Sequence, residues 1–193
     1  MDKMVVPILL GSVRRDRQCE RVARYIDAAL TLRGHEPVLV DPLELQLPLL
    51  DRMYKEHPPG EAPATLERLA ALYRRADGFL VVSAEYNNGI PPALKNLLDH
   101  FLEEYFWRPS GIVCYSQGQF GGVRAAMQLR MVLAELGMSS VPTILPIPRV
   151  QEALDEMGAA KTDKLAKPTA RFLDEFAWHA AALKRQRAEG VPY

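Results

Sequence analysis

The sequence predicts an α/β domain with a five-stranded parallel sheet covered by helices on both faces. Short apolar runs alternate with longer amphipathic runs along the chain, and elements that alternate in this way form parallel sheets. The apolar runs are continuous, which is typical of strands that are buried on both faces. Chain length and strand number favour the strand order 2-1-3-4-5 over the six-stranded order of dinucleotide-binding domains.

The first strand is expected over residues 4–10, although Pro7 lacks an amide donor and proline is rare in central strands. The next helix has Val22, Ile26 and Leu30 four residues apart on one stripe, and Gly34 is expected to end it. The expected ranges are helix 18–33, strand 36–41, a proline-bearing connection 42–63, helix 65–75, strand 78–83, helix 91–102, strand 111–115, helix 122–136, strand 141–147, and one or two helices within 151–187. This element order is that of a flavodoxin-like fold.

The length of 193 residues fits a single domain, 1–193, with a C-terminal helical extension from about residue 151. Lys plus Arg and Asp plus Glu both number 24, and this zero net charge argues against nucleic-acid partners and against attachment to anionic membranes. No apolar run reaches the roughly 20 residues that span a bilayer, and the N-terminus lacks a signal-peptide pattern. Cys19 and Cys114 are far apart and the histidines lack metal-binding spacing, so we expect a reducing cytoplasm, no disulfide and no metal site.

Ligands of such sheets bind beyond the carboxyl ends of the strands, so we expect function in the loops after strands 1, 3 and 4. In the first of these loops, Gly11 allows a tight turn and Ser12 supplies a hydroxyl group. Arg14 or Arg17 can bind phosphate oxygens at the N-terminus of the following helix. The loop is neither a Walker A motif nor GxGxxG. An exposed polar loop with solvated arginines explains the same residues equally well.

The loop after the third strand, 83–96, is rich in hydrogen-bonding and turn-forming residues. Its backbone amides and Tyr86 suit a planar heteroaromatic ring, whereas a turn at Asn87-Asn88-Gly89 explains the same sequence by geometry alone. The loop after the fourth strand, 115–122, has three glycines that permit close backbone approach to a ligand, or simply a flexible turn. Ser116 in it is not a nucleophile elbow, because Cys114 occupies the place of the first glycine of GxSxG.

With these loops, the sequence resembles the NADPH-dependent FMN reductase family of the flavodoxin-like fold. The family's G-S-x-R segment is matched by Gly11, Ser12 and Arg14. Its longer P-E-Y-N-x-x-I-P-x-x-L-K-N segment is matched by Glu85, Tyr86, Asn87, Ile90, Pro91, Leu94, Lys95 and Asn96, and its glycine-rich segment by Gly118, Gly121 and Gly122. The chain departs from the pattern at Ala84, where proline is common, at Pro92, where glycine is common, and at Arg17, where many members have serine. The resemblance spans residues 4–147.

The resemblance implies an FMN cofactor with its phosphate on the first loop and its ring on the other two. The implied phosphate contacts are Ser12, Arg14, Arg17 and the backbone at Gln18 and Cys19, next to Gly11. The implied ring contacts are Glu85, Tyr86, Asn87, Asn88, Ser116, Gln117, Gly118 and Gly121. No catalytic side chain is implied, because the flavin carries the redox chemistry.

The resemblance also implies hydride transfer from NADPH, or from NADH, to FMN, and then electron transfer to a flavin, a quinone or an azo compound. It implies a homodimer or a homotetramer. A flavodoxin-type electron carrier, or a flavin-binding interaction protein, is the alternative. Flavodoxins have a Thr/Ser-rich phosphate loop and are usually acidic, whereas this loop bears arginines and the chain has zero net charge, which favours the reductase.

Overall fold

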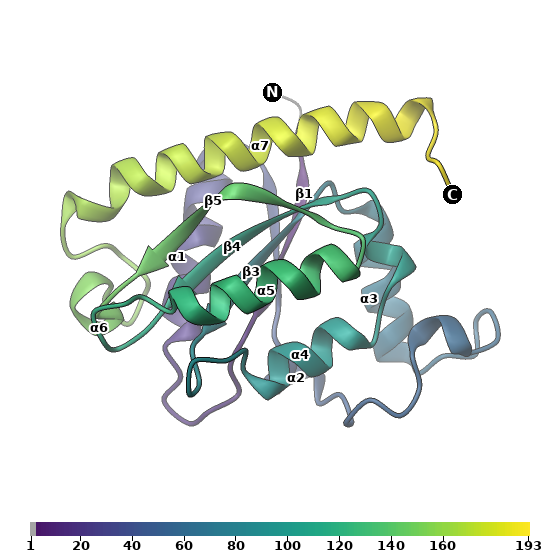
Figure 1. Ribbon diagram of the computed structural model, residues 1–193, viewed down its shortest axis with the longest axis horizontal. Coiled ribbons are helices and arrows are strands. Elements are labelled where there is room, and N and C mark those ends of the chain that lie inside the picture. Colours follow the sequence, from purple (N-terminus) through teal and green to yellow (C-terminus); the bar gives the residue numbers. More distant parts are fainter. Residues whose placement is uncertain (1–2) are drawn as a thin grey trace.

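The computed structural model describes residues 3–193. Within these residues, five parallel strands form one sheet in the order β2-β1-β3-β4-β5, which confirms the predicted topology. Figure 1 labels β1, β3, β4 and β5 of this sheet. The strands are β1 (Val5–Leu10), β2 (Glu36–Val40), β3 (Phe79–Ala84), β4 (Pro109–Tyr115) and β5 (Ser139–Ile147). β2 lies on one side of β1, and β3, β4 and β5 follow in order on the other side. The carboxyl ends of β1 and β3 therefore flank the switch point of the fold.

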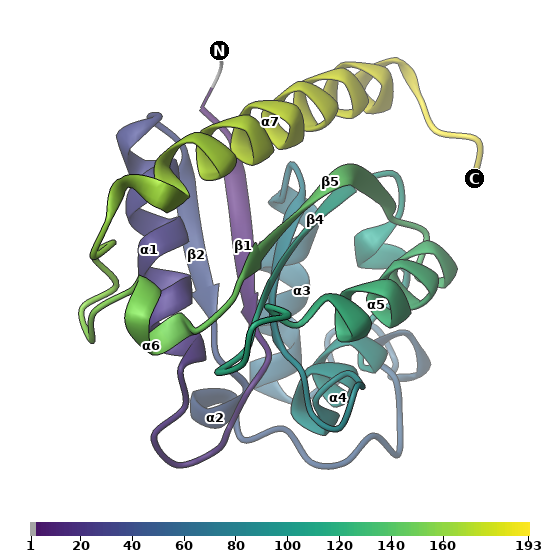
Figure 2. The ribbon, with the colours of Figure 1, turned by 60° about the vertical axis from the view of Figure 1, so that its left-hand side comes forward.

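Helices cover both faces of the sheet (Figure 2). One apolar core lies between the sheet and α1 and α7, and the other lies between the sheet and α3, α4 and α5. The helices are α1 (Cys19–Leu32), α2 (Pro42–Leu45), α3 (Ala64–Arg75), α4 (Pro92–Asp99), α5 (Val123–Glu135), α6 (Val150–Ala153) and α7 (Ala166–Glu189). Short 3-10 turns occur at Tyr54–Glu56, Glu103–Tyr105 and Asp163–Leu165. No helix within residues 3–193 is long and apolar enough to cross a membrane.

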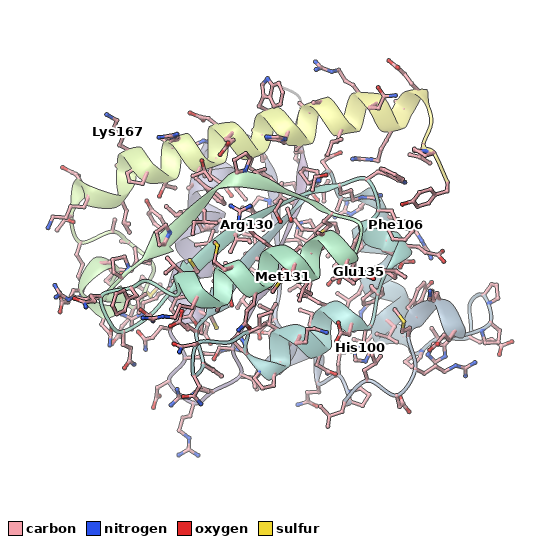
Figure 3. The ribbon with its side chains drawn as sticks, viewed as in Figure 1. His100, Phe106, Arg130, Met131, Glu135 and Lys167 are labelled. Carbon is pink, nitrogen blue, oxygen red and sulfur yellow. The ribbon has the colours of Figure 1, made fainter. Side chains whose placement is uncertain are left out.

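The prolines of the strands lie where the sheet tolerates a missing amide donor. Pro7 pairs with Val38 of β2 but lies outside the β1–β3 ladder, which begins at Ile8. Pro142 and Pro146 belong to β5, an edge strand, where proline leaves the interior ladders intact. The guanidinium of Arg130 on α5 reaches back over this edge and donates hydrogen bonds to the carbonyls of Val141 and Pro142 (Figure 3).

Two segments differ from the sequence-based expectation. The helix expected over 91–102 ends at Asp99, because the chain turns after His100 into the 3-10 turn Glu103–Tyr105. The connection expected over 42–63 contains α2, because the Asp41 carboxylate accepts a hydrogen bond from the Leu43 amide and caps that short helix. The C-terminal part contains the two helices α6 and α7.

Candidate functional site

A cavity of about 510 Å³ lies at the carboxyl ends of β1, β3 and β4. Its volume is in the usual range for small-molecule sites, about 300–1,000 Å³. The three predicted loops line it: Ser12, Arg14, Arg15, Asp16, Arg17 and Gln18 from the first, Ala84, Glu85 and Tyr86 from the second, and Tyr115, Ser116, Gln117 and Gly118 from the third. We call it the first cavity.

The predicted site residues therefore divide into two groups. Nine of them line the first cavity: Ser12, Arg14, Arg17, Gln18, Glu85, Tyr86, Ser116, Gln117 and Gly118. The others support the loops from outside the lining, namely Gly11, Cys19, Asn87, Asn88 and Gly121. Four further lining residues are not among the predicted site residues: Arg15, Asp16, Ala84 and Tyr115. Of these, Tyr115 ends a predicted strand at the carboxyl end of the sheet, where ligands bind.

The first loop presents backbone donors to the cavity. Among residues 3–193, the amide N–H groups of residues 15–18 have no protein acceptor, and Gln18 provides no side-chain cap for α1. Free N–H groups at the N-terminus of a helix of this length, together with the helix dipole, favour an anionic group. Arg14 and Arg15 are exposed and have no acidic partner in the same part of the chain.

Arg17 has a different environment from its two neighbours. Its side chain is only 7% exposed, and its guanidinium forms a two-pronged ion pair with Asp41 at 2.5 and 2.6 Å. Nη1 also donates to the Ser12 carbonyl at 3.0 Å, and Nε donates to Glu20 at 2.8 Å. Burial alone would lower the pKa of Arg17, but the hydrogen bonds to Asp41 and Glu20 outweigh it and raise the pKa above its ordinary value. Arg17 thus fixes the loop to the end of β2.

Both cysteines are buried free thiols. Cys19 lies beneath the first loop, where its Sγ donates to the Ser12 carbonyl at 3.4 Å. Burial raises the pKa of Cys19 to about 11 and the pKa of Cys114 to about 12, so both remain protonated at neutral pH. Neither has the thiolate character that a nucleophilic cysteine needs.

The second loop forms a tight turn between Tyr86 and Gly89. The amide of each residue donates to the carbonyl of the other, at 3.0 and 2.9 Å. Asn87 and Asn88 between them have φ angles of 50° and 65°, which both central positions of a type I′ turn require. Asparagine tolerates this conformation better than most residues. The turn aims the Tyr86 side chain at the first cavity, and the Tyr86 hydroxyl contacts Ser12 Oγ.

Glu85 joins the second loop to the third. Its Oε2 accepts hydrogen bonds from the Arg124 and Ala125 amides at 3.0 and 3.3 Å, and its Oε1 pairs with the Arg124 guanidinium at 3.1 Å. The carboxylate therefore caps the N-terminus of α5, which follows the third loop. Gly122 lets α5 begin close against the end of β4, because its φ is +80° and a Cβ there would lie 2.8 Å from the Tyr115 carbonyl oxygen.

Tyr115, Ser116 and Gly118 line the first cavity at the carboxyl end of β4. Tyr115 is buried, and burial raises the pKa of its hydroxyl well above the ordinary value, so the hydroxyl stays protonated. Ser116 Oγ donates to the Gly118 carbonyl at 3.0 Å and shapes the rim. No described atom lies within 4 Å of the position of a Cβ on Gly118, so its backbone is open to the cavity.

The residues present fit a flavin mononucleotide. The free amides and unpaired arginines of the first loop match the phosphate, and Tyr86, Tyr115 and the open backbone at Gly118 match a planar ring. Within residues 3–193, no group of three or more His, Cys, Asp or Glu side chains is arranged to hold a metal ion.

A parallel 2-1-3-4-5 sheet with helices on both faces and a cavity at its switch point places the chain in the flavodoxin-like class of α/β folds. The sequence matches the NADPH-dependent FMN reductase family over residues 4–152. It is 32% identical over 195 residues to an NAD(P)H-dependent FMN reductase of Schizosaccharomyces pombe, covering 94% of this chain and 86% of that protein. A quinone reductase of Escherichia coli K12 is 32% identical over 139 residues, covering 70% of this chain and 72% of that protein.

Solved structures agree on the fold. The flavoenzyme NAD(P)H:acceptor oxidoreductase FerB of Paracoccus denitrificans superposes with a TM-score of 0.75 at 23% identity, covering 93% of this chain and 98% of that chain. A flavodoxin of Pseudomonas aeruginosa gives a TM-score of 0.54 at 24% identity, covering 94% and 99%. The chain belongs to the NADPH-dependent FMN reductase family, a family of oxidoreductases with FMN and NAD(P)H as cofactors, which confirms the resemblance seen in the sequence.

Proposed function

We propose that this protein transfers two electrons from NADPH, through FMN in the first cavity, to a small-molecule acceptor of the quinone, flavin or azo class. For a quinone, the hydride of NADPH and one proton from water yield the hydroquinone and NADP⁺. Bound FMN supplies the redox chemistry, and the residues of the chain bind, orient and shield it. The observation that carries the proposal is a single cavity with an anion-binding end and a ring-binding end.

The phosphate end is assigned to residues 12–18. The free amides of the loop, the α1 dipole and the unpaired charges of Arg14 and Arg15 all favour a dianion there. A direct contact between Arg17 and the phosphate stays a prediction, because the hydrogen bonds of Arg17 go to Asp41, Glu20 and Ser12. We assign Arg17 the role of holding the loop in the shape that presents its amides.

The ring end is assigned to Tyr86, Tyr115 and the loop 116–118. Backbone N–H groups near a flavin favour negative charge that develops on reduction. Glu85 supports this end through the α5 N-terminus, because its carboxylate is already occupied by Arg124 and Ala125. We assign no side chain as a catalytic acid or base.

The proposed assembly is a homodimer or homotetramer, and the proposed location is a reducing cytoplasm. Support for the assembly comes from an apolar hollow of about 370 Å³ beside the first loop, which Val13, Leu43, Leu49 and Pro92 help to line. Leu43 is 47% and Leu49 is 84% exposed, and clustered apolar exposure marks interaction surfaces. Two buried free thiols suit a reducing compartment.

The test is an anaerobic titration of the FMN-loaded protein with NADPH, followed by the visible absorbance of the flavin. We expect tight FMN binding, rapid bleaching, and recovery of the colour when air is admitted. Quinones, free flavin and azo dyes are then compared as acceptors by the rate of NADPH oxidation. Bound FMN that NADPH does not bleach would indicate an electron carrier, and a failure to bind FMN would refute the proposal.

A further inference from the structure

A second cavity of about 420 Å³ lies on the other side of the third loop, between the β5–α6 connection and the turn at Asp163–Leu165. The third loop separates the two cavities and is fastened to that connection. The Arg149 amide donates to the Gly118 carbonyl, and the Val150 amide donates to the Ser116 carbonyl, both at 3.0 Å. The two cavities are therefore neighbours at the carboxyl end of the sheet.

The second cavity combines an apolar lining with cations that have no acidic partner. Pro148, Ala153 and Leu165 supply the apolar surface, and Arg149 and Lys164 are both exposed at its rim. Neither of these two side chains forms an ion pair or hydrogen bond within residues 3–193, in contrast to Arg17 and Arg124, which are paired with carboxylates. A flat apolar group that carries a compact anion is complementary to such a surface.

The backbone at Arg149 is held in an uncommon conformation. Its φ and ψ angles are +46° and 53°, in the left-handed region that residues with a Cβ rarely adopt. Strained backbone of this kind is concentrated at ligand clamps and active sites. In this conformation the amide of Arg149, the residue after Pro148, donates to the Gly118 carbonyl. The Cα of Arg149 therefore lies beside the third loop, and its side chain lines the second cavity.

The other hollows lack one of the required features. The hollow beside the first loop has no charged side chain in its lining. The small hollow near β2 contains cations, but Arg17 and Arg24 are paired there with Asp41 and Glu20. The hollow that Arg108 and Arg187 line lies at the amino end of β4, whereas the first cavity lies at the carboxyl ends of the strands.

We propose that the second cavity binds the adenosine end of NADPH, with the 2′-phosphate between Arg149 and Lys164 and the adenine against Pro148 and Leu165. This inference rests on the proposed function, because it requires the nicotinamide end to reach the first cavity. It assigns the donor preference: the protein uses NADPH in preference to NADH, which lacks the 2′-phosphate. Glu152 and Thr162 also line the cavity, and we assign the ribose hydroxyls to them.

The first experiment measures kcat/KM for NADPH and for NADH in the double variant R149Q/K164Q. Glutamine keeps polar side chains and removes both charges. We expect kcat/KM for NADPH to fall about tenfold or more, through KM, with kcat/KM for NADH and the Kd for FMN unchanged. The charge-matched control is K167Q/R171Q, because both residues are exposed on α7 outside the cavity lining and Lys167 points away from the body of the protein (Figure 3).

The second experiment measures binding without turnover. The FMN-loaded protein is titrated calorimetrically with 2′,5′-ADP, and 5′-AMP serves as the ligand that lacks the 2′-phosphate. We expect 2′,5′-ADP to bind more tightly than 5′-AMP, and R149Q/K164Q but not K167Q/R171Q to abolish the difference. An unchanged ratio of NADPH to NADH efficiency, or equal binding of the two nucleotides by the unaltered protein, would overturn the inference. A flavin that neither dinucleotide reduces would instead refute the proposed function, and the calorimetry would still test the site.

Discussion

The hydroxyl oxygen of Tyr86 lies 2.5 Å from Oγ of Ser12, a residue 74 positions earlier in the chain. Through this contact the first and second loops form one continuous side of the first cavity. The Arg14 guanidinium lies over the Tyr86 ring, 5.6 Å from its centroid. The phosphate end and the ring end of the proposed flavin site are therefore linked through a single tyrosine.

Removing the Tyr86 hydroxyl tests this link. Tyr86→Phe keeps the ring and the cation–π contact but deletes the hydrogen bond, and Ser12→Ala deletes it from the other side. Because such a hydrogen bond contributes about 1 kcal/mol, we expect either variant to raise the Kd for FMN about fivefold. The double variant should lose no more than the worse single variant, because the two residues share one interaction. Fully additive losses in fluorescence titrations with FMN would show that the contact does not matter.

Breaking the ion pair between Arg17 of the first loop and Asp41 after β2 should lower the stability of the protein. Asp41→Asn removes the two-pronged partner of the buried Arg17 and leaves only the more exposed Glu20 carboxylate, so the free energy of unfolding should fall by about 3 kcal/mol. Urea denaturation measures this loss. The double variant R17Q/D41N should be more stable than D41N alone, since it removes a buried charge that Glu20 alone neutralises only in part. A D41N protein as stable as the unaltered chain would exclude this role for the pair.

Glu85 should act on flavin binding through helix α5. Glu85→Gln weakens the charged cap on the Arg124 and Ala125 amides, so we expect the free energy of unfolding to fall by about 1 kcal/mol and FMN to bind more weakly. The matched control is Arg124→Gln, which removes the exposed ion pair and leaves the amide cap in place. If R124Q weakens FMN binding as much as E85Q does, the ion pair rather than the cap organises the ring end.

The buried thiols predict a loss of stability in alkaline solution. Folding raises the pKa of Cys19 from 9.0 to about 11 and that of Cys114 from 9.0 to about 12, so between pH 9 and 11 the unfolded chain has lost protons that the folded chain retains. Each thiol then lowers the free energy of unfolding by about 1.4 kcal/mol per pH unit in this range. Below pH 9 their contribution is constant. Urea denaturation of C19A and C114A should show a shallower alkaline slope than the unaltered protein, and an equal slope would contradict the assignment.

The sheet and its order could be predicted because they depend on local patterns. Continuous apolar runs identify buried parallel strands, and the switch point then follows from the strand order. The same logic located the three loops that line the first cavity. That the chain forms one domain, and which residues contact the cofactor, stay predictions.

The pairings within the site could not be predicted, because they depend on how distant loops meet in space. The sequence indicated Arg17 as a phosphate ligand. Nothing near Arg17 in the sequence indicates that the Asp41 carboxylate pairs with its charge. Asn96 of the L-K-N segment also gained a specific explanation: its side chain donates to the Pro48 carbonyl and accepts from the Leu50 amide, at 2.8 and 2.9 Å. It thereby fastens the long connection after β2 to α4.

Gly118 and Gln119 are adjacent in the third loop, yet Gly118 lines the first cavity and Gln119 lines the second. This short segment of the third loop therefore separates the two cavities and lines both of them. A substitution at Gly118 or Gln119 alters a segment that both cavities share, so it should affect FMN binding and dinucleotide binding together. Arg149, Lys164 and Leu165 line the second cavity but not the first, so substitutions of their side chains should change the second cavity and leave the first as it is.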